Sequence, residues 1–120
     1  MAGLEIKSVS SPEETRPFTD DKGKVGVVGV GGHPVLYGTF EPGWRWSEHV
    51  KPIAGTDSCQ ATHLFYCLSG RMHVVMNDGS EGEIGPGDVV SIDPGHDAWV
   101  VGDEPCVSVD FGGFAQYAKR

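Results

Sequence analysis

Glycine and proline divide this chain into short apolar runs, and that spacing limits the fold more than any other feature. The 120 residues include 18 Gly and 8 Pro. Between them lie runs of strand length, rich in Val, Ile and aromatic residues, at positions 25–30, 35–40, 44–50, 63–68, 72–76, 89–92, 98–101 and 106–111. No apolar pattern with a helical period extends over three turns. The sequence therefore predicts an all-β, antiparallel sandwich or barrel with little or no helix.

Turn-forming sequences predict how these strands connect. Ser69-Gly70 and Asn77-Asp78-Gly79-Ser80 are typical of hairpin turns, and Gly85-Pro86-Gly87-Asp88 is typical of a turn that leads into a strand. Residues 1–24 are polar and carry two prolines, so we expect an extended N-terminal arm with one edge strand near residues 4–9. The length allows one domain, which we place at residues 25–111, followed by a tail at 112–120.

The charge balance excludes several classes of partner. The formal net charge is −8, and the stretch between Arg71 and Lys119 holds nine acidic residues but no Lys or Arg. Binding to nucleic acid or to an anionic membrane requires basic residues, so we expect neither partner. Acidic turns facing the solvent are the simplest interpretation of the acidic stretch.

The cysteines and the N-terminus predict a cytoplasmic location. Cys59, Cys67 and Cys106 are an odd number without CxxC spacing, which is typical of reduced thiols in the cytosol. No segment has the apolar length of a signal peptide or of a membrane-spanning helix.

Histidine is the residue type that suggests chemistry. Imidazole binds Zn, Fe, Ni and Cu, and three histidines on different strands could form an open metal site at a barrel mouth. The chain has His33, His49, His63, His73 and His96, although any one of them alone is more often structural. Cys59 and His63 also form a conceivable nucleophile pair, for which the sequence offers no third, orienting group.

Two motifs in order resemble those of the cupin family. Gly43-Trp-Arg-Trp-Ser-Glu-His49 resembles the opening of the first cupin motif, and His63-Leu-Phe-Tyr-Cys-Leu-Ser-Gly70 resembles its end. After a short intermotif stretch, Gly87-Asp-Val-Val-Ser-Ile-Asp-Pro-Gly95-His96 resembles the second motif. The resemblance covers about residues 25–111 and implies a jelly-roll barrel, a homodimer and, in many members, a bound metal.

Three positions depart from the family pattern. The usual second His falls on Lys51, the usual Glu falls on His63, and the usual His of the second motif falls on Ala98, two residues after His96. Two hypotheses follow. In the first, a divalent Zn, Fe, Mn or Ni is held by His49, His63 and His96, with Cys59 or Asp57 as a fourth ligand. In the second, the pocket is metal-free and binds a small ligand as a non-catalytic sensing module.

A small, anionic organic ligand is expected in either case. If residues 44–51 form a strand, Arg45 and Lys51 share a face with His49 and could hold a carboxylate. Phe65, His73 and Trp99 complete the expected pocket, whereas Trp44 and Trp46 are expected to pack in the core or at a dimer interface. The leading function is metal-assisted chemistry of an oxygenase, isomerase or decarboxylase type, because the fold alone does not choose among them.

Overall fold

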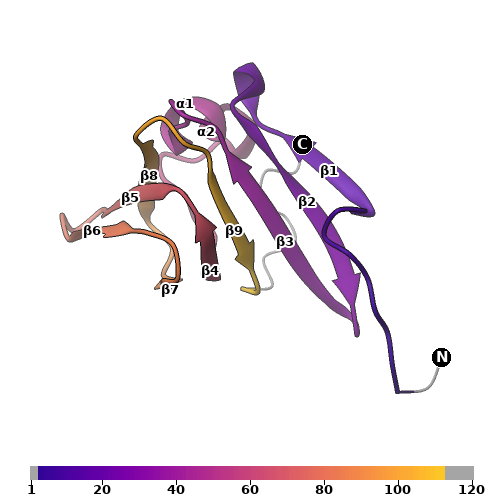
Figure 1. Ribbon diagram of the computed structural model, residues 1–120. Helices are drawn as coiled ribbons and strands as arrows, with labels where there is room; N and C mark the ends of the chain where they lie inside the picture. The colour runs from indigo at the N-terminus through magenta and orange to yellow at the C-terminus, as the bar shows by residue number, and fades with distance from the viewer. Residues whose placement is uncertain (1–2, 113–120) are drawn as a thin grey trace.

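Two antiparallel sheets face each other in the computed structural model, which describes residues 3–112 (Figure 1). The larger sheet has the order β1-β2-β3-β9-β4-β7 and the smaller one has the order β6-β5-β8. The larger sheet consists of β1 (Glu14–Pro17), β2 (Gly23–Val30), β3 (His33–Phe40), β9 (Cys106–Asp110), β4 (His63–Ser69) and β7 (Val89–Ile92). The smaller one consists of β6 (Glu81–Ile84), β5 (Arg71–Met76) and β8 (His96–Val101).

The core fills the space between the sheets because apolar residues alternate along the strands. In β8, His96, Ala98 and Val100 are buried, whereas their neighbours are half-buried. Phe18, Phe40 and Trp44 pack ring against ring, with centroids 4.7–5.7 Å apart. The two antiparallel sheets, with only short helices among the described residues, confirm the predicted all-β fold of the jelly-roll type. The sheets do not close into a continuous barrel.

The predicted turns are confirmed by the strand connections. Gly70 joins β4 to β5, residues 77–80 join β5 to β6, and residues 85–88 join β6 to β7. Gly70 has a φ of 76°, and a Cβ there would lie 2.2 Å from the Pro105 carbonyl oxygen. Only glycine allows the chain to turn so close to the neighbouring backbone. The strand β6 was not predicted, because Glu81–Ile84 has a single large apolar side chain.

The prediction of a strand at residues 44–50 is wrong. The chain forms two short helices there, α1 (Trp46–His49) and α2 (Lys51–Ala54). Pro52 lies in the first turn of α2, where its missing N–H is not needed, and Gly55 ends the helix in the left-handed conformation. Arg45, His49 and Lys51 therefore do not share the face of a strand.

The N-terminal segment differs from the expected arm in one respect. No strand forms near residues 4–9; instead β1 pairs with β2, and a 3-10 turn, η1 (Thr19–Asp21), connects them. The residues before β1 run past the end of β2, where Glu13 accepts from the Gly29 backbone N–H and Glu5 accepts from that of Gly31 (Figure 1). Leu4 and Ile6 are exposed in this segment. Residues 113–120 of the expected tail lie outside the described residues. Within residues 3–112, no helix is long and apolar enough to cross a membrane.

Candidate metal-binding site

Three side chains from separate parts of the chain meet between the sheets. The thiol of Cys59 and one ring nitrogen each of His63 and His96 all lie within 4.8 Å of one another. His63 begins β4 and His96 begins β8. Cys59 lies in the loop before β4, where its backbone N–H donates to the His96 carbonyl (2.7 Å) and its carbonyl accepts from Gly95 (2.7 Å). This backbone bridge holds the thiol beside the imidazole of His96.

Hydrogen bonds orient both imidazoles toward the thiol. Nδ1 of His63 lies 2.5 Å from a carboxylate oxygen of Asp110, and its Nε2 lies 3.7 Å from the Cys59 sulfur. Nδ1 of His96 donates to the Asp93 carbonyl (2.8 Å). Because both Nδ1 atoms are engaged, the Nε2 atoms are the ones available as ligands. A carboxylate or carbonyl behind each ligating histidine is the usual arrangement in metal sites, so these residues fit a metal.

The same contacts change the acidity of the thiol and of one imidazole. Burial alone would lower the pKa of His63, but the hydrogen bonds to Asp110 and Cys59, together with their charges, raise it to about 9. Burial alone would raise the pKa of Cys59, but His63 and His96 lower it to about 7. Without a metal, the His63 side chain is therefore an imidazolium at neutral pH, and the Cys59 thiol is about half ionised.

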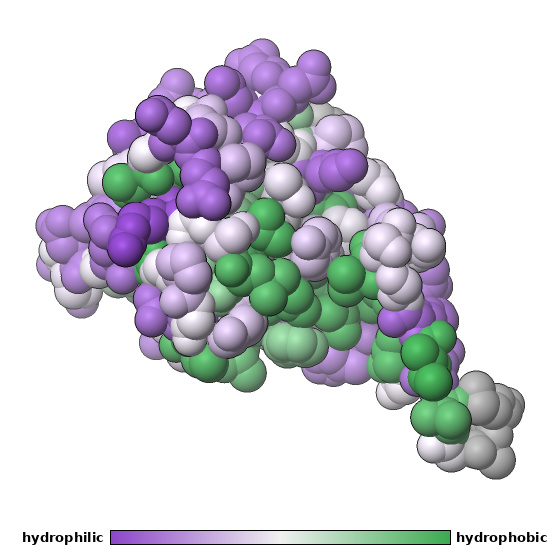
Figure 2. Space-filling view, viewed as in Figure 1, coloured by the Kyte–Doolittle hydropathy of each residue, from purple (hydrophilic) through white to green (hydrophobic). Residues whose placement is uncertain are grey.

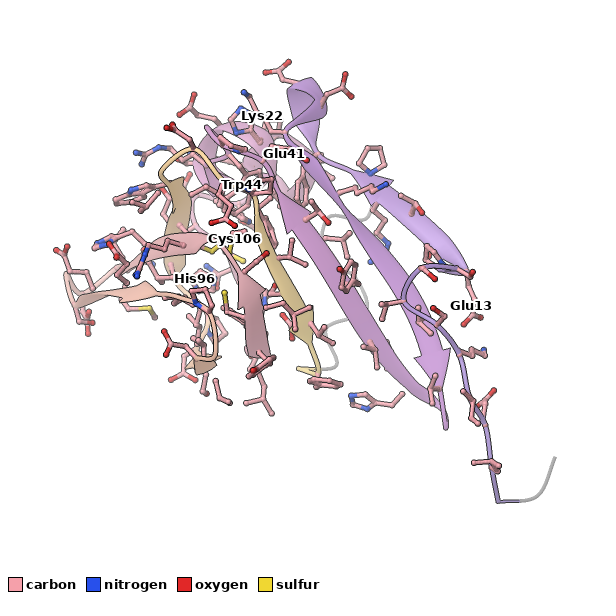
Figure 3. The ribbon with its side chains drawn as sticks, in the orientation of Figure 1. Glu13, Lys22, Glu41, Trp44, His96 and Cys106 are labelled. Atoms are coloured by element: carbon pink, nitrogen blue, oxygen red, sulfur yellow. The ribbon has the colours of Figure 1, made fainter. Side chains whose placement is uncertain are left out.

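A cavity opens beside the three residues. It lies between the sheets, with about 40 Å³ of space for the centres of water molecules. Cys59, His63, His96, Ser108 and Asp110 supply its polar wall. The remaining wall is apolar and is formed mainly by Leu36, Phe40, Trp44, Trp46, Phe65 and Ile92. Trp44 and His96 are both seen between the two sheets in Figure 3.

His49, the residue that matches the first cupin motif, lies apart from this group. It is buried in α1, and its Nδ1 accepts a hydrogen bond from the Arg45 backbone N–H (3.0 Å). The helix at residues 46–49 turns the side chain back onto its own backbone instead of presenting it on a strand. Asp57, considered as a fourth ligand, is fully exposed and lies 3.9 Å from the ammonium of Lys51.

Of the five predicted ligand-binding residues, Phe65 lines the cavity. Arg45, His73 and Trp99 come together elsewhere: the Arg45 guanidinium lies 4.3 Å above the Trp99 ring, and the His73 ring lies 4.9 Å from it. Arg45 also pairs with Glu48 and Asp97, and His73 with Glu81. Lys51 is partly exposed and does not line the cavity.

Asp110 is the site residue that sequence reasoning missed. A detectable signal was present, since Cys106, Ser108 and Asp110 alternate along β9 and the first two are buried. An acidic residue at the inward-facing position of a strand is unusual and points to a buried partner. Trp44 and Trp46 are buried as expected, and both also line the cavity.

Solved structures share the fold at low sequence identity. A sugar phosphate isomerase from a cupin superfamily, from Silicibacter pomeroyi, is 18% identical, with a TM-score of 0.61 over 88% of this chain and 73% of that one. A polyketide cyclase from Streptomyces resistomycificus is 17% identical, with a TM-score of 0.61 over 90% and 78%. Ectoine synthase from P. lautus is 14% identical, with a TM-score of 0.60 over 91% and 78%.

Sequence comparison assigns the family. No protein with a curated function matches the chain. The model of the cupin domain matches residues 53–112, which is half of the chain and includes the whole Cys59, His63 and His96 group. The protein therefore belongs to the cupin family.

Proposed function

We propose that this cupin binds a divalent transition metal through Cys59, His63 and His96, and a small organic molecule in the adjoining cavity. One observation carries the proposal: a thiol and two Nε2 atoms converge while both Nδ1 atoms are held by acceptors. Three protein ligands would leave a position open for the organic molecule. The reaction would then be a metal-assisted conversion of that molecule.

The ligand set narrows the choice of metal. One thiolate and two imidazoles favour Zn or Fe(II), and also suit Ni, over the hard Mn, which prefers oxygen ligands. When bound, the metal would supply a Lewis acid next to the cavity. Asp110 would keep the proton of His63 on Nδ1, and the Asp93 carbonyl would do the same for His96. The apolar lining would exclude bulk water from the organic molecule.

The similar solved structures do not choose a reaction. They are an isomerase, a cyclase and a synthase by name, and at identities of 14–18% they carry the fold alone. The alternative, a metal-free binding or sensing module, uses the same cavity.

All three cysteines have free thiols in this structure, which suits the reducing cytoplasm in which we place the protein.

Metal content distinguishes these two functions. Untagged protein is purified, refilled with Zn, Fe(II), Ni or Mn and analysed by mass spectrometry, with Cys59→Ser, His63→Ala and His96→Ala beside it. His73→Ala is the matched control, because this histidine binds Glu81 outside the cavity. We expect about one metal per chain in wild type and in the control, and a loss of at least tenfold in affinity in the other three. Wild type below about 0.1 metal per chain after refilling contradicts the proposal.

A second candidate is covalent catalysis by Cys59. Cys59, His63 and Asp110 are arranged like a nucleophile, its base and the orienting carboxylate, at 3.7 Å and 2.5 Å. Reaction with iodoacetamide tests it in metal-free protein. A chain that takes up no metal, and whose Cys59 is alkylated about tenfold faster than free cysteine at pH 7, supports this candidate over the first.

We also propose that a second copy covers the outer side of β4, as the cupin resemblance implies. Leu64, Tyr66 and Leu68 alternate with the buried residues of this strand and are each nearly half exposed. Val89 lies opposite Tyr66 on β7 and is 73% exposed. Hydrophobic residues also gather in the middle and lower part of the face shown in Figure 2. Light scattering should give a dimer mass for wild type and a monomer mass for Tyr66→Lys; a monomeric wild type contradicts the proposal.

A further inference from the structure

The hydroxyl of Ser108 is a buried polar group that opens onto the cavity. Ser108 is 6% exposed, and within residues 3–112 its side chain forms no hydrogen bond. The hydroxyl is not sealed, because the nitrogen and oxygen atoms of these residues that lack both a partner and contact with solvent are the indole nitrogens of Trp44 and Trp46. Since Ser108 lines the cavity, its oxygen is open to that space. Most buried polar side chains are paired, so this hydroxyl is unusual.

The position of Ser108 on β9 directs its side chain inward. Side chains alternate between the two faces of a strand, and Cys106, two positions before Ser108, is buried. Ser108 lies opposite the buried Cys67 of β4 and opposite Gly38 of β3, which lines the cavity. A Cβ on Gly38 would lie 2.5 Å from the Phe40 ring, so this ring covers Gly38. The cross-strand neighbours of the hydroxyl are therefore a thiol, which is a weak acceptor, and an aromatic ring.

The other polar side chains of the wall are already bonded or sealed. Oδ1 of Asp110 accepts from two backbone N–H groups, and Oδ2 contacts Nδ1 of His63. The imidazoles of His63 and His96 belong, with the Cys59 thiol, to the proposed metal site. The indole nitrogens are closed to solvent. Among the described residues that line the cavity, Ser108 therefore supplies the side-chain oxygen that remains available to an organic molecule.

Ser108 and the proposed metal site are separated along the larger sheet. Asp110, which contacts His63, is two residues further along β9, and two residues of a strand span about 7 Å. On β4, Ser108 lies opposite Cys67, which is four positions beyond His63. The wall between them is apolar, with Phe65 opposite Asp110. A molecule that contacts both ends would need a metal-binding group, an apolar body and a second polar group.

We infer that Ser108 is a ligand-binding residue, and that its hydroxyl forms a hydrogen bond with an oxygen atom of the organic molecule, at the end remote from the metal. A serine hydroxyl both donates and accepts, so a hydroxyl or a carbonyl oxygen fits it. Ser108 selects against an all-carbon molecule of the same shape, because such a molecule would leave the buried hydroxyl unpaired. This inference rests on the proposed function, since it names a second contact of the molecule in the same cavity.

A double-mutant cycle tests the inference. The probes are mercaptoethanol, mercaptopropanol and mercaptobutanol, whose thiol can bind a metal, and each is paired with the alkanethiol in which CH₃ replaces OH. Each probe is titrated by NMR into ¹⁵N-labelled full-length protein, once metal-free and once loaded with Zn. Wild type is compared with Ser108→Ala and Ser91→Ala. Ser91 is the matched control, because it is exposed on β7 and does not line the cavity.

The measured quantity is the ratio of the affinity for each alcohol to the affinity for its alkanethiol. At the chain length that reaches Ser108, we expect Ser108→Ala to lower this ratio by about 2- to 12-fold, the range for one neutral hydrogen bond. The decrease should appear in both forms of the protein, because the hydroxyl does not contact the metal, and Ser91→Ala should leave the ratio unchanged. The midpoint of urea unfolding of Ser108→Ala should be no lower than that of wild type, because no hydrogen bond to a described residue is lost.

Several outcomes overturn the inference. It is wrong if none of the probes binds in either form of the protein, or if Ser108→Ala leaves the ratio unchanged for every pair of probes. It is also wrong if Ser91→Ala lowers the ratio as much, or if the urea midpoint of Ser108→Ala falls, because the hydroxyl would then have a structural partner. Metal content is measured on the same samples, so a failure here with one Zn per chain leaves the proposed metal site intact.

Discussion

Replacing Asp110 by Asn removes one acceptor from the His63 imidazole and preserves the other contacts of this side chain. Oδ1 of Asp110 accepts from the backbone N–H groups of Leu64 (3.3 Å) and Gly112 (2.8 Å), and the amide oxygen of Asn can do the same. The other carboxylate oxygen, 2.5 Å from Nδ1 of His63, becomes an NH₂ group that cannot accept. His63 is then free to carry its proton on Nε2, where it cannot bind a metal.

The loss should appear in metal affinity more than in folding. Removing a hydrogen-bond partner of a ligating histidine weakens metal binding by about 10- to 100-fold, which corresponds to about 1.4–2.7 kcal/mol. We expect this decrease for Zn, measured by competition with a chelator of known affinity at pH 8. Asp97→Asn is the control, since the Asp97 side chain accepts from the backbone of Ser47 and Ala98 and does not line the cavity. Equal losses in the two variants, or no loss in Asp110→Asn, would refute the role of Asp110.

Three further predictions concern protons, the backbone and the ligand set. At pH 7 the His63 imidazole, with a pKa of about 9, is protonated and the Cys59 thiol, with a pKa of about 7, is half protonated, so Zn binding should release about 1.5 protons. Calorimetry in buffers of different ionisation enthalpy measures the number of protons released. The apparent affinity for Zn should rise with pH up to about 9, and an affinity that does not change with pH would contradict this prediction. Gly70→Ala should lower the free energy of unfolding by more than about 3 kcal/mol, because its Cβ would lie 2.2 Å from a backbone oxygen. Gly87→Ala, at a φ of 90° with nothing within 4 Å, should cost only about 1–2 kcal/mol in urea unfolding, and equal losses would show that crowding at Gly70 is unimportant. His49→Ala should bind Zn with an affinity within about threefold of that of wild type. A larger loss of affinity would show that His49 is a metal ligand.

Strand and turn assignments were predictable because they depend on local chemistry. A Gly-rich turn and a period-two apolar run specify their structure within a few residues, and Ser69-Gly70 shows this at the β4–β5 connection. The segment 44–50 was not predictable in the same way. Its alternation of large aromatic and polar residues is typical of a strand, but the segment pairs with the backbone of β8 at Trp44 and Arg45 and then coils into α1 and α2.

In the candidate site, too, the residue types could be predicted from the sequence, whereas their contacts could not. Its residue types were visible in the sequence, and His63, His96 and Cys59 were among the proposed ligands. Which of the histidines would meet was not visible, because it depends on the bridge between Cys59 and His96 and on the start of β4 beside β7. Arg45 and Lys51 were expected in the pocket because residues 44–51 were predicted to form a strand. The segment forms α1 and α2 instead, and both side chains lie outside the cavity.

The sequence by itself determined that this chain forms an antiparallel β-fold, since turn residues and apolar alternation act over a few neighbouring residues. The cupin type was indicated by the resemblance of its two motifs to those of that family. Only the tertiary structure decided the chemistry. It placed Asp110 from β9 behind His63, 47 positions earlier in the chain, and it tied the backbone of Cys59 to that of His96. Contacts of that range depend on how the sheets pack. The alternation along β9 marks Asp110 as facing inward, but it does not specify which residue Asp110 contacts.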